Sequence, residues 1–183
     1  MNIIDPHLHL FSLQQGDYHW LRPENPPMWP DKSNIYRNFS EQDLALPAPL
    51  NLSGFVHIEA GFDNQKPWRE IAWLTKHHQA LSAQQLPLFK AVAFIDITAD
   101  QVSFNAQLKQ LLAYSAVVGC RYILDDEAAT ILQLPQVQKN LATLAEHQLS
   151  FDVQMPLTDF NAVNELLKLL SCQPRLQVII NHA

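Results

Sequence analysis

Six short apolar runs rich in Val, Ile and Phe occur along this chain, and segments with helical spacing separate most of them. Strands that alternate with helices are typical of a parallel sheet with crossover connections, and continuous apolar runs are typical of strands buried on both faces. The sequence therefore predicts an α/β fold with six parallel strands. The runs are NIIDPHLHL from residue 2, GFVHIEA from residue 54, LFKAVAFID from residue 88, AVVGCRYIL from residue 116, SFDVQM from residue 150 and LQVIINHA from residue 176.

Four segments between these runs carry apolar residues at helical spacing, which predicts amphipathic helices. Ser40 before EQDL and Thr158 before DFNAV are the predicted N-caps, because a hydroxyl at that position accepts a hydrogen bond from the first helical turn. The predicted apolar positions are Trp68, Ile71, Ala72 and Leu74; Phe104, Leu108, Leu111 and Leu112; Val137, Leu141 and Leu144; and Phe160, Val163, Leu167 and Leu170.

The arrangement of these units favours a barrel over an open doubly wound sheet. An open sheet usually has a glycine-rich phosphate turn after its first strand, and none of the four glycines lies there. A closed (β/α) barrel takes at least roughly 200 residues, whereas this chain has 183. We therefore expect one domain, 1–183, with an incomplete TIM-barrel-like fold that contains about six of the eight strands.

The first connection, residues 13–53, contains most of the twelve prolines and interrupts regular structure. A connection of this length is either a functional lid or binding loop, or a solvated excursion.

Composition limits the partners of this chain. The formal net charge is -6 and no basic run is present, which argues against nucleic acid and anionic membranes and favours a small-molecule substrate. Cys120 and Cys172 lie far apart without paired spacing, so we expect free buried thiols in a reducing compartment. With neither a secretory signal nor an apolar span of membrane length, the expected location is the cytoplasm.

The first run carries an aspartate and two histidines, Asp5, His7 and His9, each two residues from the next. Side chains two apart on a strand share a face, so two imidazoles can converge on one ion or one substrate atom. His182 ends the last run, where a barrel would bring it to the same mouth. Three histidines suit zinc and leave positions open for water and substrate. A single H-x-H also arises by chance, and an isolated histidine is more often a core or surface residue.

Taken together in order, several segments resemble the amidohydrolase-related branch of the amidohydrolase superfamily, near the sugar-lactone and pyrone-dicarboxylate hydrolases. The segments are IDPHLHLF, YHWL, NFSEQDL, GFVHIEA, VAFIDI, VVGCRYIL, FDVQM and VIINHA, from residue 3 to residue 183. The resemblance implies a barrel that opens cyclic esters by attack of water. It also places His7, His9 and His182 around the scissile carbonyl. Two alternatives stay open: these histidines hold a divalent ion such as Zn or Mn, or they act on substrate without a metal.

Two residues of the first half are candidates for substrate binding. Glu59 ends the second run, where it would accept hydrogen bonds from substrate hydroxyls or support a ligand, and the alternative is a solvated loop acid. Trp20 in YHWL resembles the family's loop that covers the pocket, and the alternative is packing.

Two residues of the second half are further candidates for substrate binding. Arg121 interrupts an apolar strand and needs an anionic partner, which is either a substrate carboxylate or phosphate, or a structural acid such as Asp125 or Asp152. Gln154 would orient substrate if it faces the mouth of the barrel.

The resemblance also predicts an aspartate on a final strand that this chain does not contain. Relatives carry on their final strand an aspartate that acts as general base or metal ligand, and no residue of this chain corresponds to it. We therefore expect 183 residues of a longer enzyme that are inactive alone. Two alternatives stay open: a second copy or a partner supplies the remainder and covers the sheet edges, or the chain is a natural truncation without activity. The alternative functions are a decarboxylase of the same family and a noncatalytic small-molecule-binding protein.

Overall fold

The computed structural model describes residues 1–80 and 87–181, and the chain forms two compact units, Met1–Ala91 and Val92–Ala183. Within the described residues the strand order follows the chain, β1-β2-β3-β4-β5-β6. The pairs β1–β2, β4–β5 and β5–β6 are parallel. A parallel sheet in chain order is the order of a (β/α) barrel, whereas a doubly wound sheet reverses its order. The prediction of an incomplete TIM-barrel-like α/β fold is confirmed.

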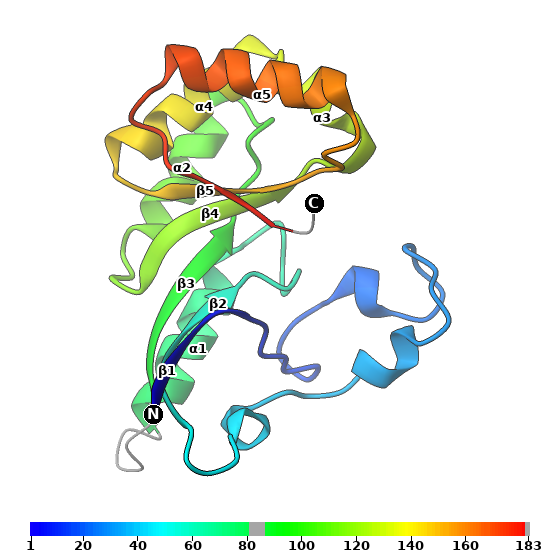
Figure 1. Cartoon of the computed structure of the whole chain (residues 1–183), viewed down its shortest axis with the longest axis vertical. Coiled ribbons are helices and arrows are strands. Elements are labelled where there is room, and N and C mark those ends of the chain that lie inside the picture. Colours follow the sequence, from blue (N-terminus) through cyan, green and yellow to red (C-terminus); the bar gives the residue numbers. More distant parts are fainter. Residues whose placement is uncertain (81–86, 182–183) are drawn as a thin grey trace. The chain divides into compact units, whose positions relative to one another are not determined.

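The first unit is built around β1 (Asn2–Leu8) and β2 (Asn51–Ile58), which lie side by side in Figure 1. Helix α1 (Trp68–Ala80) follows β2, and β3 (Leu88–Phe94) begins in this unit and ends in the second. Leu74 of α1 packs with Phe55 of β2 and with Leu10, which follows β1. This packing holds α1 against β2 and against the segment that follows β1.

The long connection between β1 and β2 contains three short 3-10 helices, η1 (His19–Leu21), η2 (Lys32–Ile35) and η3 (Glu41–Leu44). Its first part packs against the chain that follows β2, in a buried cluster made of Phe11, Tyr18, Leu21, Ala60 and Phe62. The Ser40 side chain accepts a hydrogen bond from the Gln42 amide, which confirms Ser40 as an N-cap. The connection is therefore anchored to the first unit rather than being a solvated excursion throughout.

The second unit alternates strands and helices. Its elements are α2 (Gln101–Leu111), β4 (Val117–Ile123), η5 (Asp125–Glu127), α3 (Ala128–Leu132), α4 (Pro135–Glu146), β5 (Ser150–Gln154), α5 (Phe160–Cys172) and β6 (Val178–Ile180). Helix α4 buries the predicted apolar positions Val137, Leu141 and Leu144. Helix α2 buries Phe104, Leu108 and Leu111, whereas Leu112 of the predicted face follows the helix and is 40% exposed. Helix α3 lies between two predicted elements and was not expected.

Helix α5 corrects two predictions. Its N-cap is Asp159 and not Thr158, because the Asp159 carboxylate accepts the amides of Asn161 and Ala162, and aspartate is the stronger capping residue. The buried face consists of Ala162, Leu166 and Leu169, whereas Phe160 and Leu167 of the predicted face are 78% and 58% exposed. Both stripes have helical spacing in this leucine-rich helix, so spacing alone could not choose between them.

Both cysteines are free thiols, as predicted, but only Cys120 is buried and Cys172 is exposed at the end of α5. None of the helices in the described part of the chain combines the length and the apolar character that crossing a membrane requires.

Candidate active site

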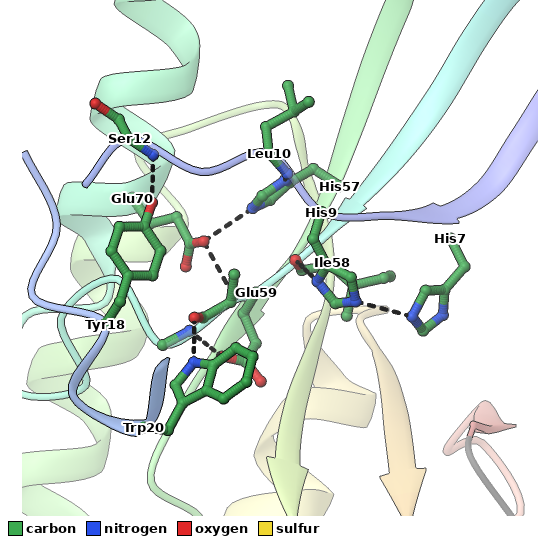
Figure 2. Close-up of polar contacts among 12 residues, drawn as sticks. His7, His9, Leu10, Ser12, Tyr18, Trp20, His57, Ile58, Glu59 and Glu70 are labelled. Carbon is green, nitrogen blue, oxygen red and sulfur yellow. Dashed lines mark hydrogen bonds and ion pairs between the residues drawn. The ribbon is translucent and has the colours of Figure 1, made fainter. Parts of the chain in front are cut away.

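The carboxyl end of β1 brings His7 and His9 together (Figure 2). The two Nε2 atoms are 3.2 Å apart, and the rings meet edge to face with their centroids 5.1 Å apart. Asp5, on the same strand, accepts a hydrogen bond from the His7 backbone amide at 2.9 Å. The expected convergence of the two imidazoles is therefore present, and Asp5 stabilises the backbone that carries them.

The second nitrogen of His9 determines how its ring is protonated. Nδ1 lies 2.9 Å from the carbonyl oxygen of Ile58, at the end of β2. A carbonyl only accepts, so in the neutral ring Nδ1 carries the proton and Nε2 carries a lone pair. That lone pair is directed at Nε2 of His7, where it can accept a proton or bind a cation.

The spacing of the pair also fits a shared metal ion. Two nitrogens bound at about 2.0–2.1 Å with tetrahedral angles are separated by about 3.3 Å. The observed separation of His7 and His9 Nε2 is 3.2 Å. Among residues 1–80 and 87–181, no group of three or more His, Cys, Asp or Glu side chains is arranged around one ion position. The predicted third ligand, His182, lies outside the described residues, so its assignment stays a prediction.

Glu59 follows β2 directly, as expected, but it is a buried acid with 3% exposure and not a solvated one. Its Oε2 accepts the Gly61 amide at 3.0 Å. Trp20, in η1, donates its indole N–H to the Ala60 carbonyl at 2.7 Å (Figure 2). Both predicted substrate-binding residues of the first unit are therefore hydrogen-bonded to the backbone of the segment Glu59–Gly61.

Gly61 has a positive φ of +70°, and a Cβ on it would come within 2.6 Å of Cδ1 of Trp20. The tryptophan ring therefore lies directly on this backbone, which only glycine allows in that conformation. The contact fixes Trp20 beside Glu59.

Sequence reasoning missed a buried pair in the same unit, His57 of β2 and Glu70 of α1. His57 Nε2 is 2.9 Å from Oε1 of Glu70, and the side chains are 0% and 2% exposed. Burial lowers the pKa of His57 to about 3 and raises the pKa of Glu70 to about 8, the latter against the hydrogen bond from the Ala60 amide. The available signal was an acid within the apolar positions of α1, next to Ile71.

Arg121 and Gln154 meet in the second unit. Arg121 lies on β4 and is 5% exposed, and its Nη2 donates to Oε1 of Gln154 at the end of β5. Nε2 of Gln154 donates in turn to Asp125 at 3.3 Å. Asp152 pairs with Arg121 in the strand register. The two predicted substrate-binding residues of this unit are therefore neighbours on adjacent strands.

Asp152 lies opposite Arg121 on the neighbouring strand and interacts with its charge. Burial raises the pKa of Asp152, while the Asn181 side chain, at 2.6 Å, and the charge of Arg121 oppose that rise. Arg121 thus has both a charged and an amide neighbour, in agreement with a buried guanidinium that requires partners.

Comparison with known proteins places this fold. No family model matches the chain. This chain is 29% identical, over 191 aligned residues, to the uncharacterized protein y4mH of Sinorhizobium fredii. The match covers 98% of this chain and 61% of that protein. The chain thus spans less than two thirds of this relative.

Solved structures of amidohydrolases share the fold. An amidohydrolase of Burkholderia multivorans with bound zinc matches at a TM-score of 0.65 and 14% identity, covering 98% of this chain and 57% of that one. Amidohydrolase 2 of Bifidobacterium longum subsp. infantis matches at a TM-score of 0.60 and 17% identity, covering 97% and 60%. At the level of the fold the expected resemblance is confirmed: over somewhat more than half of their length, this chain has the α/β architecture of amidohydrolases.

Proposed function

We propose that this protein is a hydrolase of the amidohydrolase type that opens a small lactone or similar cyclic ester by attack of water. The observation that carries the proposal is the His7–His9 pair at the carboxyl end of β1, with its Nε2 atoms 3.2 Å apart. In barrel folds this end of the strands carries the chemistry. The chain spans 57 to 61% of the relatives described, so the proposal concerns the activity of the whole protein.

His7 and His9 fit a divalent cation by spacing and by donor chemistry, and we propose them as ligands together with His182. The zinc in the Burkholderia multivorans amidohydrolase supports zinc as the first candidate, with manganese as the second. When bound, such an ion polarises a carbonyl oxygen and lowers the pKa of water towards neutrality. The Nδ1–H of His9, bonded to the Ile58 carbonyl, keeps its Nε2 free of a proton for this role.

The same pair also suits chemistry without a metal. Nε2 of His9 accepts the proton of the attacking water and returns it to the leaving alkoxide of the opened ring, while an N–H of His7 donates a hydrogen bond to the substrate carbonyl oxygen. Glu59 and Trp20 are proposed to bind substrate hydroxyls and one face of the ring. Arg121, with Gln154, is proposed to bind a substrate carboxylate by charge-assisted hydrogen bonds.

A lactone panel tests the proposal on the full protein, assayed with added zinc, with added manganese and with chelator, alongside elemental analysis. We expect ring opening, detected as acid release, and its loss in His7→Ala and His9→Ala. Activity that survives the chelator assigns the metal-free route, and activity that requires zinc or manganese assigns the other. An inert protein in all three conditions, or release of carbon dioxide in place of ring opening, overturns the proposal.

A further inference from the structure

A buried hydrogen-bond chain joins the backbone that follows β1 to the backbone that follows β2 (Figure 2). The Leu10 amide donates to Nδ1 of His57 at 3.2 Å, and Nε2 of His57 lies 2.9 Å from Oε1 of Glu70. The Ala60 amide donates to the same carboxylate oxygen at 3.0 Å. Two backbone amides from different loops are therefore connected through two side chains.

The donors in this chain are assigned by chemistry. Nδ1 of His57 accepts the Leu10 amide, so it carries no proton and the ring is neutral with its proton on Nε2. That Nε2–H donates to Glu70, whose oxygen also accepts the Ala60 amide. Protonating Nδ1 would place two hydrogens against each other, so the chain is directional and holds only one tautomer of His57.

Each end of the chain lies next to a residue of the candidate active site. Leu10 follows His9, and Ala60 follows Glu59. Ile58 lies two residues before Ala60, and its carbonyl accepts Nδ1–H of His9 at 2.9 Å. The Ala60 carbonyl accepts the indole N–H of Trp20 at 2.7 Å.

We propose that His57 and Glu70 are positioning residues: their hydrogen-bond chain fixes the backbone at Ile58–Ala60 and thereby holds His9 in the Nδ1–H tautomer, with Nε2 directed at His7. The consequence for rate rests on the hydrolase function proposed above, whereas the orientation of His9 does not. Burying a histidine and a glutamate is costly compared with an apolar pair of similar volume. Partners behind a functional histidine commonly account for 10- to 100-fold in metal affinity or activity.

The test compares Glu70→Leu with Glu70→Gln in the 183-residue chain. Gln keeps an oxygen that accepts both N–H groups, whereas Leu removes this shared acceptor at similar volume. Two-bond ¹H–¹⁵N spectra of the histidine rings report which nitrogen of His9 is protonated. We expect the Nδ1–H form in the wild type and in Glu70→Gln, and a shift towards mixed protonation in Glu70→Leu.

Ile71→Val is the matched control, because it alters packing at the neighbouring position of α1 without touching the hydrogen-bond chain, and it should leave the His9 signals unchanged. If Glu70→Leu does not fold, His57→Phe decides, since it keeps a planar ring but removes both the donor to Glu70 and the acceptor of the Leu10 amide. An unchanged His9 tautomer in the folded Glu70→Leu variant, or in the folded His57→Phe variant where Glu70→Leu does not fold, overturns the proposal.

Kinetics of the full protein separate this proposal from the hydrolase function. We expect kcat/KM for lactone opening to fall about 10- to 100-fold in Glu70→Leu and to stay near wild type in Glu70→Gln. A wild type without hydrolase activity overturns the proposed function and leaves the tautomer comparison decisive for positioning. An active wild type whose Glu70→Leu variant keeps the His9 tautomer and full kcat/KM overturns positioning alone.

Discussion

Nε2 of His9 lies 3.2 Å from Nε2 of His7, while Nδ1 of His9 lies 2.9 Å from the Ile58 carbonyl. One ring nitrogen is thus used to orient the ring and the other is turned to its neighbouring histidine. This division of roles supports the proposal that the end of β1 takes part in the reaction.

The two nitrogens of His9 can be separated by mutation. Asn at position 9 keeps a short side-chain amide as a donor for the Ile58 carbonyl but has no group in place of Nε2. We expect His9→Asn to remain folded, with kcat/KM reduced at least about 100-fold because the reacting nitrogen is lost. Thermal unfolding and lactone assays check this, with the exposed His147→Asn as control. Full activity in His9→Asn would contradict the assigned role.

The buried pair predicts how stability depends on pH. Burial raises the pKa of Glu70 from 4.5 to about 8 and lowers the pKa of His57 from 6.5 to about 3. Between pH 6.5 and 8 the folded state therefore binds one proton that the unfolded chain does not, so stability falls as pH rises. Below pH 4.5 the unfolded chain binds the extra proton on His57, so stability falls as pH falls.

Urea unfolding followed by circular dichroism tests this dependence. We expect the free energy of unfolding to fall by up to about 2 kcal/mol from pH 6.5 to 8, at about 1.4 kcal/mol per pH unit. Glu70→Gln removes the titrating group and should abolish the decline over this window. Equal declines in the wild type and in Glu70→Gln would show that another group is responsible.

The guanidinium of Arg121 should distinguish substrates by charge. Arg121→Lys keeps the positive charge but loses the planar fork that bonds a carboxylate at two points. We expect KM to rise about 10-fold or more for lactones that carry a carboxylate and to change little for neutral lactones. Steady-state kinetics on matched lactones measure this, and the exposed Arg175→Lys is the control. An equal effect on both substrate classes would argue for a structural role.

Gly61 should be intolerant of a side chain. Gly61→Ala places a methyl group 2.6 Å from Cδ1 of Trp20, at a φ of +70°. We expect a loss of about 1–3 kcal/mol in the free energy of unfolding and altered tryptophan fluorescence. In a Trp20→Ala background the clash with the tryptophan ring is absent. Gly61→Ala should then lower the free energy of unfolding by only about 1 kcal/mol, which is the cost of the positive φ. Equal costs in both backgrounds would contradict the contact.

Local pattern was enough for most of the secondary structure. The apolar runs became β1 to β6, and spacing located α1, α2, α4 and α5, because strands and helices follow periods that the sequence displays directly. The buried face of α5 and its cap at Asp159 were wrong, since neighbouring stripes and neighbouring caps compete at nearly equal strength.

The sequence by itself determined the parallel α/β architecture and the convergence of His7 and His9, because residues two apart on a strand must share a face. Only the tertiary structure showed that His57 and Glu70 form a buried pair, that Gly61 supports Trp20 and that Arg121 bonds Gln154. These contacts join residues 13 to 41 positions apart, and their burial and direction depend on how separate elements pack, which no local period encodes.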